Sequence, residues 1–215
     1  MTPAAAQTGR RRAVSRDALL AAALDVFLAN GFQAARIEDI AQLAGVGKGS
    51  VYLHFATKEE LFQAVVDAGV LGKLQQAETV ADNFSGAASE LLATLFHNNL
   101  IDFWDSPSSG IHKLVVAESQ RFPELAANYH DSITRRARSL IESILELGIR
   151  QGEFRNVDVP YTARLILDAL DNELIQAHAF ADAASEPFDA HRFIDVLLNL
   201  TIAGLRNTKA PEADV

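Results

Sequence analysis

Apolar residues recur at helical spacing along nearly the whole chain, and this periodicity limits the fold more than any other feature of the sequence. Ala, Leu, Ile, Val and Phe stand three or four positions apart in one stretch after another, and the alternation that is typical of strands is missing. With 215 residues, of which 49 % are hydrophobic and only 6 are proline, the chain can bury a sizeable core in one or two compact units. We predict an all-α protein.

Turn and capping residues divide this pattern into about nine helices. Ser15 is a suitable N-cap for a first helix that ends at the Asn-Gly pair at 30–31, and Gly45 ends a short second helix. A short third helix follows, and the Thr-Lys-Glu-Glu sequence at 57–60 forms a capping box that opens a long fourth helix. Later turns separate the remaining helices at residues 83–86, 105–110, 121–124, 150–160 and 184–189.

Charge is unevenly distributed along a chain whose net charge is −9. Residues 1–58 hold seven Lys or Arg against four Asp or Glu, a net charge of +3. The remaining residues hold 12 basic and 24 acidic side chains, a net charge of −12. The N-terminal end is therefore the part of the protein that can approach a polyanion such as nucleic acid.

Several residue types that would support other functions are absent. The chain has no cysteine, which excludes disulfides, thiolate zinc sites and a cysteine nucleophile, so we expect a cytoplasmic protein. Asp17 and Asp25 interrupt the first apolar stretch, and no apolar run is long enough to span a membrane, so we expect no signal peptide and no membrane contact. Catalytic motifs are also missing, and the histidines lack the spacing of paired ligands, so we expect neither an enzyme nor a bound metal or cofactor.

The second and third helices have the layout of a helix-turn-helix. Both are short, a Gly-containing turn joins them, and a packing helix precedes them. Val51 and Phe55, four residues apart, can face the first two helices, which leaves the other side of the third helix unburied. A DNA major groove accommodates such a helix, with its positively polarised N-terminus near phosphate. This layout predicts a DNA-binding unit.

The segment from about residue 12 to residue 61 carries a specific set of residues in a fixed order and spacing: Ala22, Phe27, Gly31-Phe32, Ile40-Ala41, Ala44-Gly45-Val46, Lys48-Gly49-Ser50, Tyr52, His54-Phe55, Lys58-Glu59 and Leu61. In these residues the segment resembles the DNA-binding domain of the TetR/AcrR family of bacterial transcriptional regulators. The resemblance implies that the DNA-contacting positions are Lys48, Gly49, Ser50, Tyr52, Leu53, His54 and, at a phosphate, Lys58. One departure concerns helix 2, where Ala35 and Arg36 replace the usual Thr or Ser. This helix lacks its hydroxyl cap, and we expect Arg36 to contact phosphate itself.

The last two predicted helices have two interpretations. The final one, residues 193–205, is apolar nearly all round, which fits either a core helix or a subunit interface. The resemblance implies that two chains pair through these helices as a four-helix bundle. We expect the homodimer contact at Ile166, Leu170, Leu174, Phe193, Leu197 and Leu200.

The resemblance also implies a small-molecule pocket among the helices that follow the DNA-binding domain. The pocket candidates are aromatic and polar residues, most of which would equally suit an ordinary helical core: Phe84, Phe96, Phe103, Trp104, His112, Tyr129, Asn172 and Gln176. Their apolar character favours a hydrophobic effector.

These observations predict four segments: a flexible basic arm at 1–14, a helix-turn-helix domain at 15–57, a ligand-binding and dimerisation domain at 58–207 and a C-terminal tail at 208–215. Arg10, Arg11 and Arg12 in the arm either touch DNA or only solubilise the chain. The predicted function is that of a homodimeric transcriptional repressor that binds a palindromic operator and is released by a small effector. The alternative is a helical sensor or partner-binding protein that has lost sequence-specific DNA binding.

Overall fold

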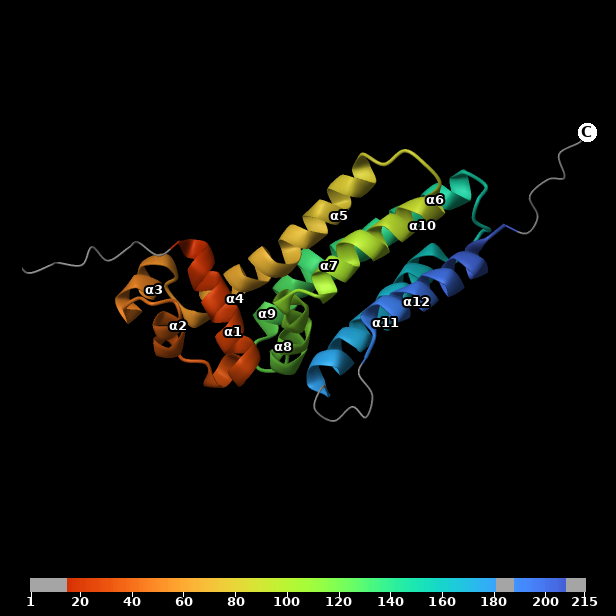
Figure 1. Ribbon diagram of the computed structural model, residues 1–215. Helices are drawn as coiled ribbons and strands as arrows, with labels where there is room; N and C mark the ends of the chain where they lie inside the picture. The colour runs from red at the N-terminus through yellow and green to blue at the C-terminus, as the bar shows by residue number, and fades with distance from the viewer. Residues whose placement is uncertain (1–14, 181–187, 208–215) are drawn as a thin grey trace, which may run out of the picture.

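The structure is a computed structural model that describes residues 15–180 and 188–207, and it is an elongated assembly of helices (Figure 1). The described residues form nine continuous helices and no strand, as the periodicity predicts. The predicted arm at 1–14, with Arg10, Arg11 and Arg12, and the predicted tail at 208–215 lie outside the described residues.

Three helices at one end of the molecule form the helix-turn-helix: α1 (Arg16–Ala34), α2 (Ile37–Leu43) and α3 (Lys48–His54). A glycine lies at the end of α1 and another follows α2, near the positions that the sequence predicts. Gly31 has a φ of 73° and breaks the regular geometry of α1, and Gly45, with a φ of 71°, follows α2. A left-handed φ strains every residue with a Cβ, so these two glycines set the direction in which the chain leaves each helix.

Side-chain caps also lie close to where the sequence predicts them. The Ser15 hydroxyl accepts a hydrogen bond of 3.2 Å from the Ala18 amide. Thr57 accepts one of 3.0 Å from the Glu60 amide, but the Glu60 carboxylate reaches the Ala56 amide, at 2.7 Å, rather than that of Thr57. The second hydrogen bond of the predicted capping box therefore comes from the residue before Thr57 instead of from Thr57 itself.

Six further helices make up the body, and three of them change locally to π-helical geometry. Their segments are α4 (Lys58–Val66), η1 (Asp67–Leu71) and α5 (Gly72–Asp82); α6 (Ala88–Thr94), η2 (Leu95–Leu100) and α7 (Ile101–Trp104); the 3₁₀ turn η3 (Pro107–Gly110) and α8 (Ile111–Glu118); α9 (Pro123–Tyr129), η4 (His130–Thr134) and α10 (Arg135–Arg150); α11 (Val159–Ala179); and α12 (Ala190–Leu205). Figure 1 shows α11 and α12 in the part of the body away from α3.

Two hydrophobic cores stabilise these helices. The first is centred on Phe27, Phe32 and Phe62, and the Phe62 ring centroid lies 5.1 Å from each of the other two. This core includes α4, α8 and α9 as well as α1 to α3, so its packing continues past residue 57. The second core joins α6, η2, α10, α11 and α12. The DNA-binding end is thus packed directly on part of the body.

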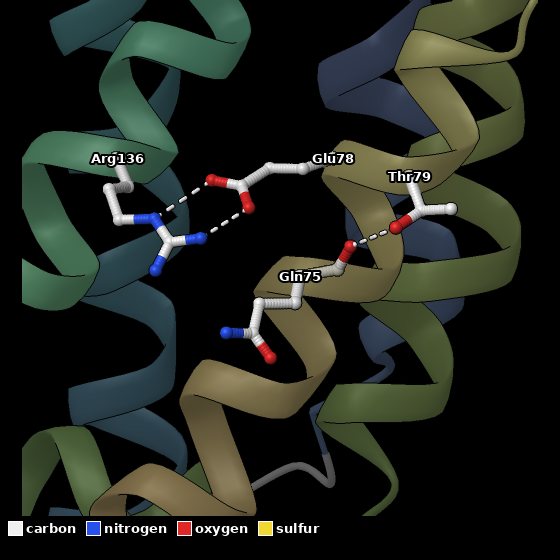
Figure 2. Close-up of polar contacts among 4 residues, drawn as sticks. All are labelled: Gln75, Glu78, Thr79 and Arg136. Carbon is white, nitrogen blue, oxygen red and sulfur yellow. Dashed lines mark hydrogen bonds and ion pairs between the residues drawn. The ribbon is translucent and has the colours of Figure 1, made fainter.

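An ion pair ties α5 to α10 (Figure 2). Arg136 donates from Nε, at 3.0 Å, and from Nη2, at 2.5 Å, to the two carboxylate oxygens of Glu78. The Thr79 hydroxyl donates to the Gln75 carbonyl within α5, at 2.8 Å. A bidentate pair fixes geometry better than a single contact does, so this link positions α5 against the body.

Candidate DNA-binding surface and internal cavity

Helix α3 has one buried and one exposed side. Val51 and Phe55 are 1 % and 3 % exposed and anchor the helix on α1 and α2. On the opposite side Tyr52 is 46 % and Leu53 is 86 % exposed, and Lys48, Gly49 and His54 are exposed as well. Ser50 is partly buried. The structure thus places an unpartnered face on α3, built from most of the residues expected to contact DNA.

Lys48 forms an ion pair on this face. Its Nζ lies 2.5 Å from the Glu38 carboxylate of α2 and 5.7 Å from the centre of the Tyr52 ring. The hydrogen bond between the two side chains raises the pKa of Lys48 and lowers the pKa of Glu38. Both groups are exposed, so the pair is weak, and a phosphate or base can compete for the ammonium. Lys48 therefore remains available to DNA on this face of α3.

Lys58 makes contacts within its own chain at the start of α4. Its Nζ donates to the carbonyl oxygens of Phe32, Gln33 and Ala35 at 2.8, 3.1 and 3.1 Å. It also lies 4.7 Å above the Phe32 ring. These contacts fasten α4 to the end of α1. The phosphate contact of Lys58 stays a prediction.

Arg36 occupies the N-cap position of α2, where no side chain caps the helix, as the sequence predicts. Its side chain is exposed and makes no hydrogen bond or ion pair within the described part of the chain. It remains a candidate phosphate contact. The helix forms without a capping hydroxyl because Ile37, Ile40 and Ala41 are buried against the first core.

A cavity of about 170 Å³ lies inside the body. Its wall is apolar except for Lys73, Asn99, Tyr129 and Asp171, and its full lining is Val70, Lys73, Leu74, Ala77, Leu95, Phe96, Asn99, Leu100, Phe103, Tyr129, Ile133, Ala137, Leu140, Ile141, Leu167, Leu170, Asp171 and Leu174. Residues of both hydrophobic cores contribute to it. The cavity therefore lies at the seam between the core that carries α3 and the core of the distal body.

All three π-helical segments contribute residues to the cavity wall. Val70 belongs to η1, Leu95 to η2 and Ile133 to η4. A π turn widens a helix locally and is common at functional sites. Three such turns around one space identify this cavity as the candidate ligand site.

Three of the eight expected pocket residues line the cavity, namely Phe96, Phe103 and Tyr129. His112 lies behind Tyr129, with its Nδ1 3.3 Å from the phenol oxygen. Trp104 instead stacks on Phe188, just before α12, with ring centroids 5.6 Å apart, and lies 6.2 Å from the ring of Phe193 on α12. Phe84, Asn172 and Gln176 also lie outside the lining.

The dimer residues expected on α11 are buried within their own chain. Ile166, Leu170 and Leu174 are 4 %, 5 % and 5 % exposed, and they pack in the second core. Leu170 and Leu174 also line the cavity. This burial favours a role of the stripe in the core of one chain.

An exposed apolar surface lies on the other side of the same two helices. It consists of Tyr161 and Leu165 on α11, 67 % and 70 % exposed, and Val196 and Leu200 on α12, 50 % and 69 % exposed. Of the interface residues expected on α12, Leu200 belongs to this surface, whereas Phe193 and Leu197 are partly buried. Both pairs have the i, i+4 spacing of one helix face. We call these four residues the α11–α12 patch.

Asp171 is a cavity residue that the sequence pattern does not reveal, because it interrupts an otherwise apolar stripe. Burial raises the pKa of its carboxyl group, with His112 lowering it and Asp168 raising it further. Burial is also the main cause of the raised pKa of the Tyr129 phenol, to which Asp171 contributes. The cavity thus combines an apolar wall with one poorly solvated acid.

In residues 15–180 and 188–207 no three His, Asp or Glu side chains come together as ligands for a metal ion. No helix among these residues is both long and apolar enough to cross a bilayer.

Sequence comparisons agree with this arrangement. The profile described as "Bacterial regulatory proteins, tetR family" matches residues 19–65, and that of the "AefR-like transcriptional repressor, C-terminal domain" matches residues 96–196. Together these matches cover more than half of the 215 residues. The chain belongs to the TetR family and is a DNA-binding transcriptional regulator. Regulators of this family bind DNA and small-molecule effectors and act as dimers.

The relatives include a transcriptional repressor and a transcriptional activator. The chain is 29 % identical over 176 residues to the transcriptional repressor KstR2 of Rhodococcus jostii, a match that covers 78 % of this chain and 82 % of that protein. It is 34 % identical over 116 residues to the transcriptional activator FasR of Mycolicibacterium smegmatis, covering 52 % and 50 %. The structure of FadR from Bacillus subtilis in complex with stearoyl-CoA is similar with a TM-score of 0.72 and 21 % identity, covering 89 % of this chain and 100 % of that one, which shows a shared fold.

Proposed function

We propose that the protein is a cytoplasmic homodimeric repressor that binds an inverted-repeat operator through the α3 helices of its two subunits. A small apolar molecule that occupies the cavity would release it from DNA. The unpartnered face of α3 carries this proposal, because Tyr52 and Leu53 remain exposed while Val51 and Phe55 hold the helix in place. An exposed helix on a packed support is the arrangement that major-groove reading requires.

The α11–α12 patch supports dimerisation. Its four apolar side chains are exposed on neighbouring helices, and the same two helices of a second chain would cover them in a four-helix arrangement. The patch lies away from α3 in Figure 1, so the two recognition helices would remain free to face DNA. Half-sites about 34–36 Å apart would then set the separation that the two α3 helices must adopt.

The position of the cavity supports control by a ligand. Its wall includes η1, the direct continuation of α4, and α4 is fastened to α1 by Lys58. Close glycine contacts join the same regions: a Cβ on Gly69 would lie 2.5 Å from the Ser108 hydroxyl oxygen, and one on Gly110 would lie 2.6 Å from Leu28 of α1. A ligand that moves η1 would therefore shift the DNA-binding end as a unit.

The alternative function is that of a sensor that has lost sequence-specific DNA binding. The uncapped start of α2 is the observation that favours it. Against it, α2 is well packed, and Lys48, Tyr52 and Leu53 keep their side chains on the outer face of α3.

Site selection from random duplex DNA, repeated at two salt concentrations, separates these functions. Phosphate attraction weakens steeply with salt on every sequence, whereas base contacts enrich particular sequences. We expect enrichment of an inverted repeat at both concentrations. Binding that depends on salt but enriches no sequence would support the sensor function instead.

A further inference from the structure

Asp171 is the one acidic side chain in the cavity wall, and nothing in the described part of the chain pairs with it. It forms no hydrogen bond or ion pair with any described residue. Its carboxylate oxygens have no hydrogen-bond partner among the described residues and are not fully enclosed. A poorly solvated carboxyl group without a partner is costly, and a residue of this kind in a ligand site commonly serves the ligand.

The charged neighbours of Asp171 form no hydrogen bond or ion pair with its carboxyl group, which leaves that group able to bind a ligand. His112 and Asp168 are the charged groups that shift the pKa of the Asp171 carboxyl group. The Nδ1 of His112 is hydrogen-bonded to the Tyr129 hydroxyl, at 3.3 Å. Asp168, one turn away, pairs with Arg164 at 3.4 Å. Lys73 also lines the cavity, and it is not among the charges that shift the pKa of Asp171.

The rest of the wall determines the shape of a suitable ligand. Apart from Lys73, Asn99 and Tyr129, every other lining residue is apolar. The volume of about 170 Å³ is close to that of an engineered cavity of about 150 Å³ that holds one benzene molecule. One six-membered ring or a short alkyl chain therefore fits inside.

We propose that the effector is an apolar amine whose ammonium group is bound by Asp171, which rests on the cavity being the effector site proposed above. A charge-assisted hydrogen bond is about twice as strong as a neutral one, and an ammonium compensates a buried carboxylate that an alcohol would leave charged and unpaired. A carboxylate on the ligand would instead face a like charge at this end of the cavity.

Four probes with the same phenyl frame test the assignment: 2-phenylethylamine, 2-phenylethanol, 3-phenylpropionate and ethylbenzene. Their affinities for the full-length protein at pH 7 can be measured by titration calorimetry or ligand-observed NMR. We expect 2-phenylethylamine to bind about tenfold more tightly than the alcohol and the acid. In Asp171→Asn this advantage should disappear, and ethylbenzene affinity should change by less than about twofold.

Asp168→Asn is the matched control, because this residue lies one turn away on α11 and outside the cavity lining. The order of the four affinities should be unchanged in this variant. The order in the unsubstituted protein is informative even if Asp171→Asn does not fold.

Each contrary result has a distinct meaning. If the acid or the alcohol binds as tightly as the amine, or if Asp171→Asn keeps the preference for the amine, the role of Asp171 is overturned and the cavity remains the effector site. If none of the four probes binds, ethylbenzene included, the effector site and the role of Asp171 both fail. Operator selection by α3 would stand in either case, because it is measured without a ligand.

Discussion

The DNA-binding end and the cavity are built in different ways. The reading surface comes from one short helix, which Val51 and Phe55 anchor on α1 and α2. The cavity takes residues from four continuous helices spread between Val70 and Leu174. A surface of the first kind follows from helical spacing alone, whereas a cavity of the second kind exists only once distant helices have packed. The two regions should therefore respond differently to substitution.

The largest expected effect separates support from recognition within the DNA-binding end. Phe62→Ala should lower the free energy of unfolding by about 3–5 kcal/mol, because its fully buried ring packs on Phe27 and Phe32. Leu53→Ala, at an 86 % exposed position on α3, should change it by less than about 0.5 kcal/mol. Chemical denaturation measures both. Equal losses of stability would mean that α3 is packed against something other than α1 and α2.

Two exposed leucines at opposite ends of the molecule provide the next comparison. Leu165→Glu in the α11–α12 patch should convert the dimer into monomers, since it would bury an unpaired charge in the interface. Leu53→Glu should leave the dimer intact and weaken DNA binding, because it adds a negative charge to the reading face. Analytical ultracentrifugation detects the first effect. A Leu165→Glu protein that remains dimeric would move the interface away from this patch.

Two residues on α3 should contribute to DNA binding in different ways. We expect Tyr52→Ala to weaken binding to every sequence, and Lys48→Ala mainly to relax selectivity at one base pair, at about 1–3 kcal/mol. Competition binding against a panel of single-base operator variants distinguishes these results. The reverse pattern would show that the base-reading part of α3 has been assigned to the wrong residue.

Asp171 in the cavity wall should make the free energy of unfolding depend on pH. The pKa of Asp171 is raised in the folded protein above its ordinary value of 3.8, mainly by burial. As the pH rises from the ordinary pKa through the folded one, the unfolded chain loses the proton more readily, so ionisation increasingly favours unfolding. Asp171→Asn should therefore stabilise the protein at pH 7, and this gain should shrink toward pH 4. Denaturation at both pH values tests this, and a gain of equal size at the two would contradict it.

The smallest expected effect concerns the ion pair on the reading face. Glu38→Gln removes a negative charge near the DNA and frees Lys48, so operator affinity should rise by about twofold, with a smaller gain at high salt. Fluorescence anisotropy measures this. Asp17→Asn, which removes an acid from the first turn of α1, is the control for a general effect of charge. An unchanged or lower affinity of Glu38→Gln would mean that the pair holds Lys48 in its binding position.

The contrast between the two ends also explains what the sequence could predict. Ser15, Gly31 and Gly45 act within a few residues of their own position, so their caps and turns were predicted correctly. The carbonyl partners of Lys58 could not be predicted, because they are 23 to 26 residues away and become acceptors only once α1 has ended at Gly31.

The body was predicted less well, for a related reason. The Leu170 and Leu174 stripe was correctly read as an apolar face, but helical spacing does not say whether the same chain or a second one covers it. Trp104 was expected in the pocket and is drawn instead into an aromatic cluster with α12, more than 80 residues away in the sequence. The π-helical turns at η1, η2 and η4 have no sequence signal of their own.

The coupling between these two ends is tested most directly by reciprocal binding. Once an operator has been selected, an apolar compound that releases the protein from it can be found by anisotropy. The affinity of that compound is then measured with and without operator DNA. Thermodynamic linkage requires the operator to weaken the compound's binding by the same factor by which the compound weakens operator binding, and we predict equal factors. A compound that binds equally well to the free and the DNA-bound protein would contradict control of α3 from the cavity.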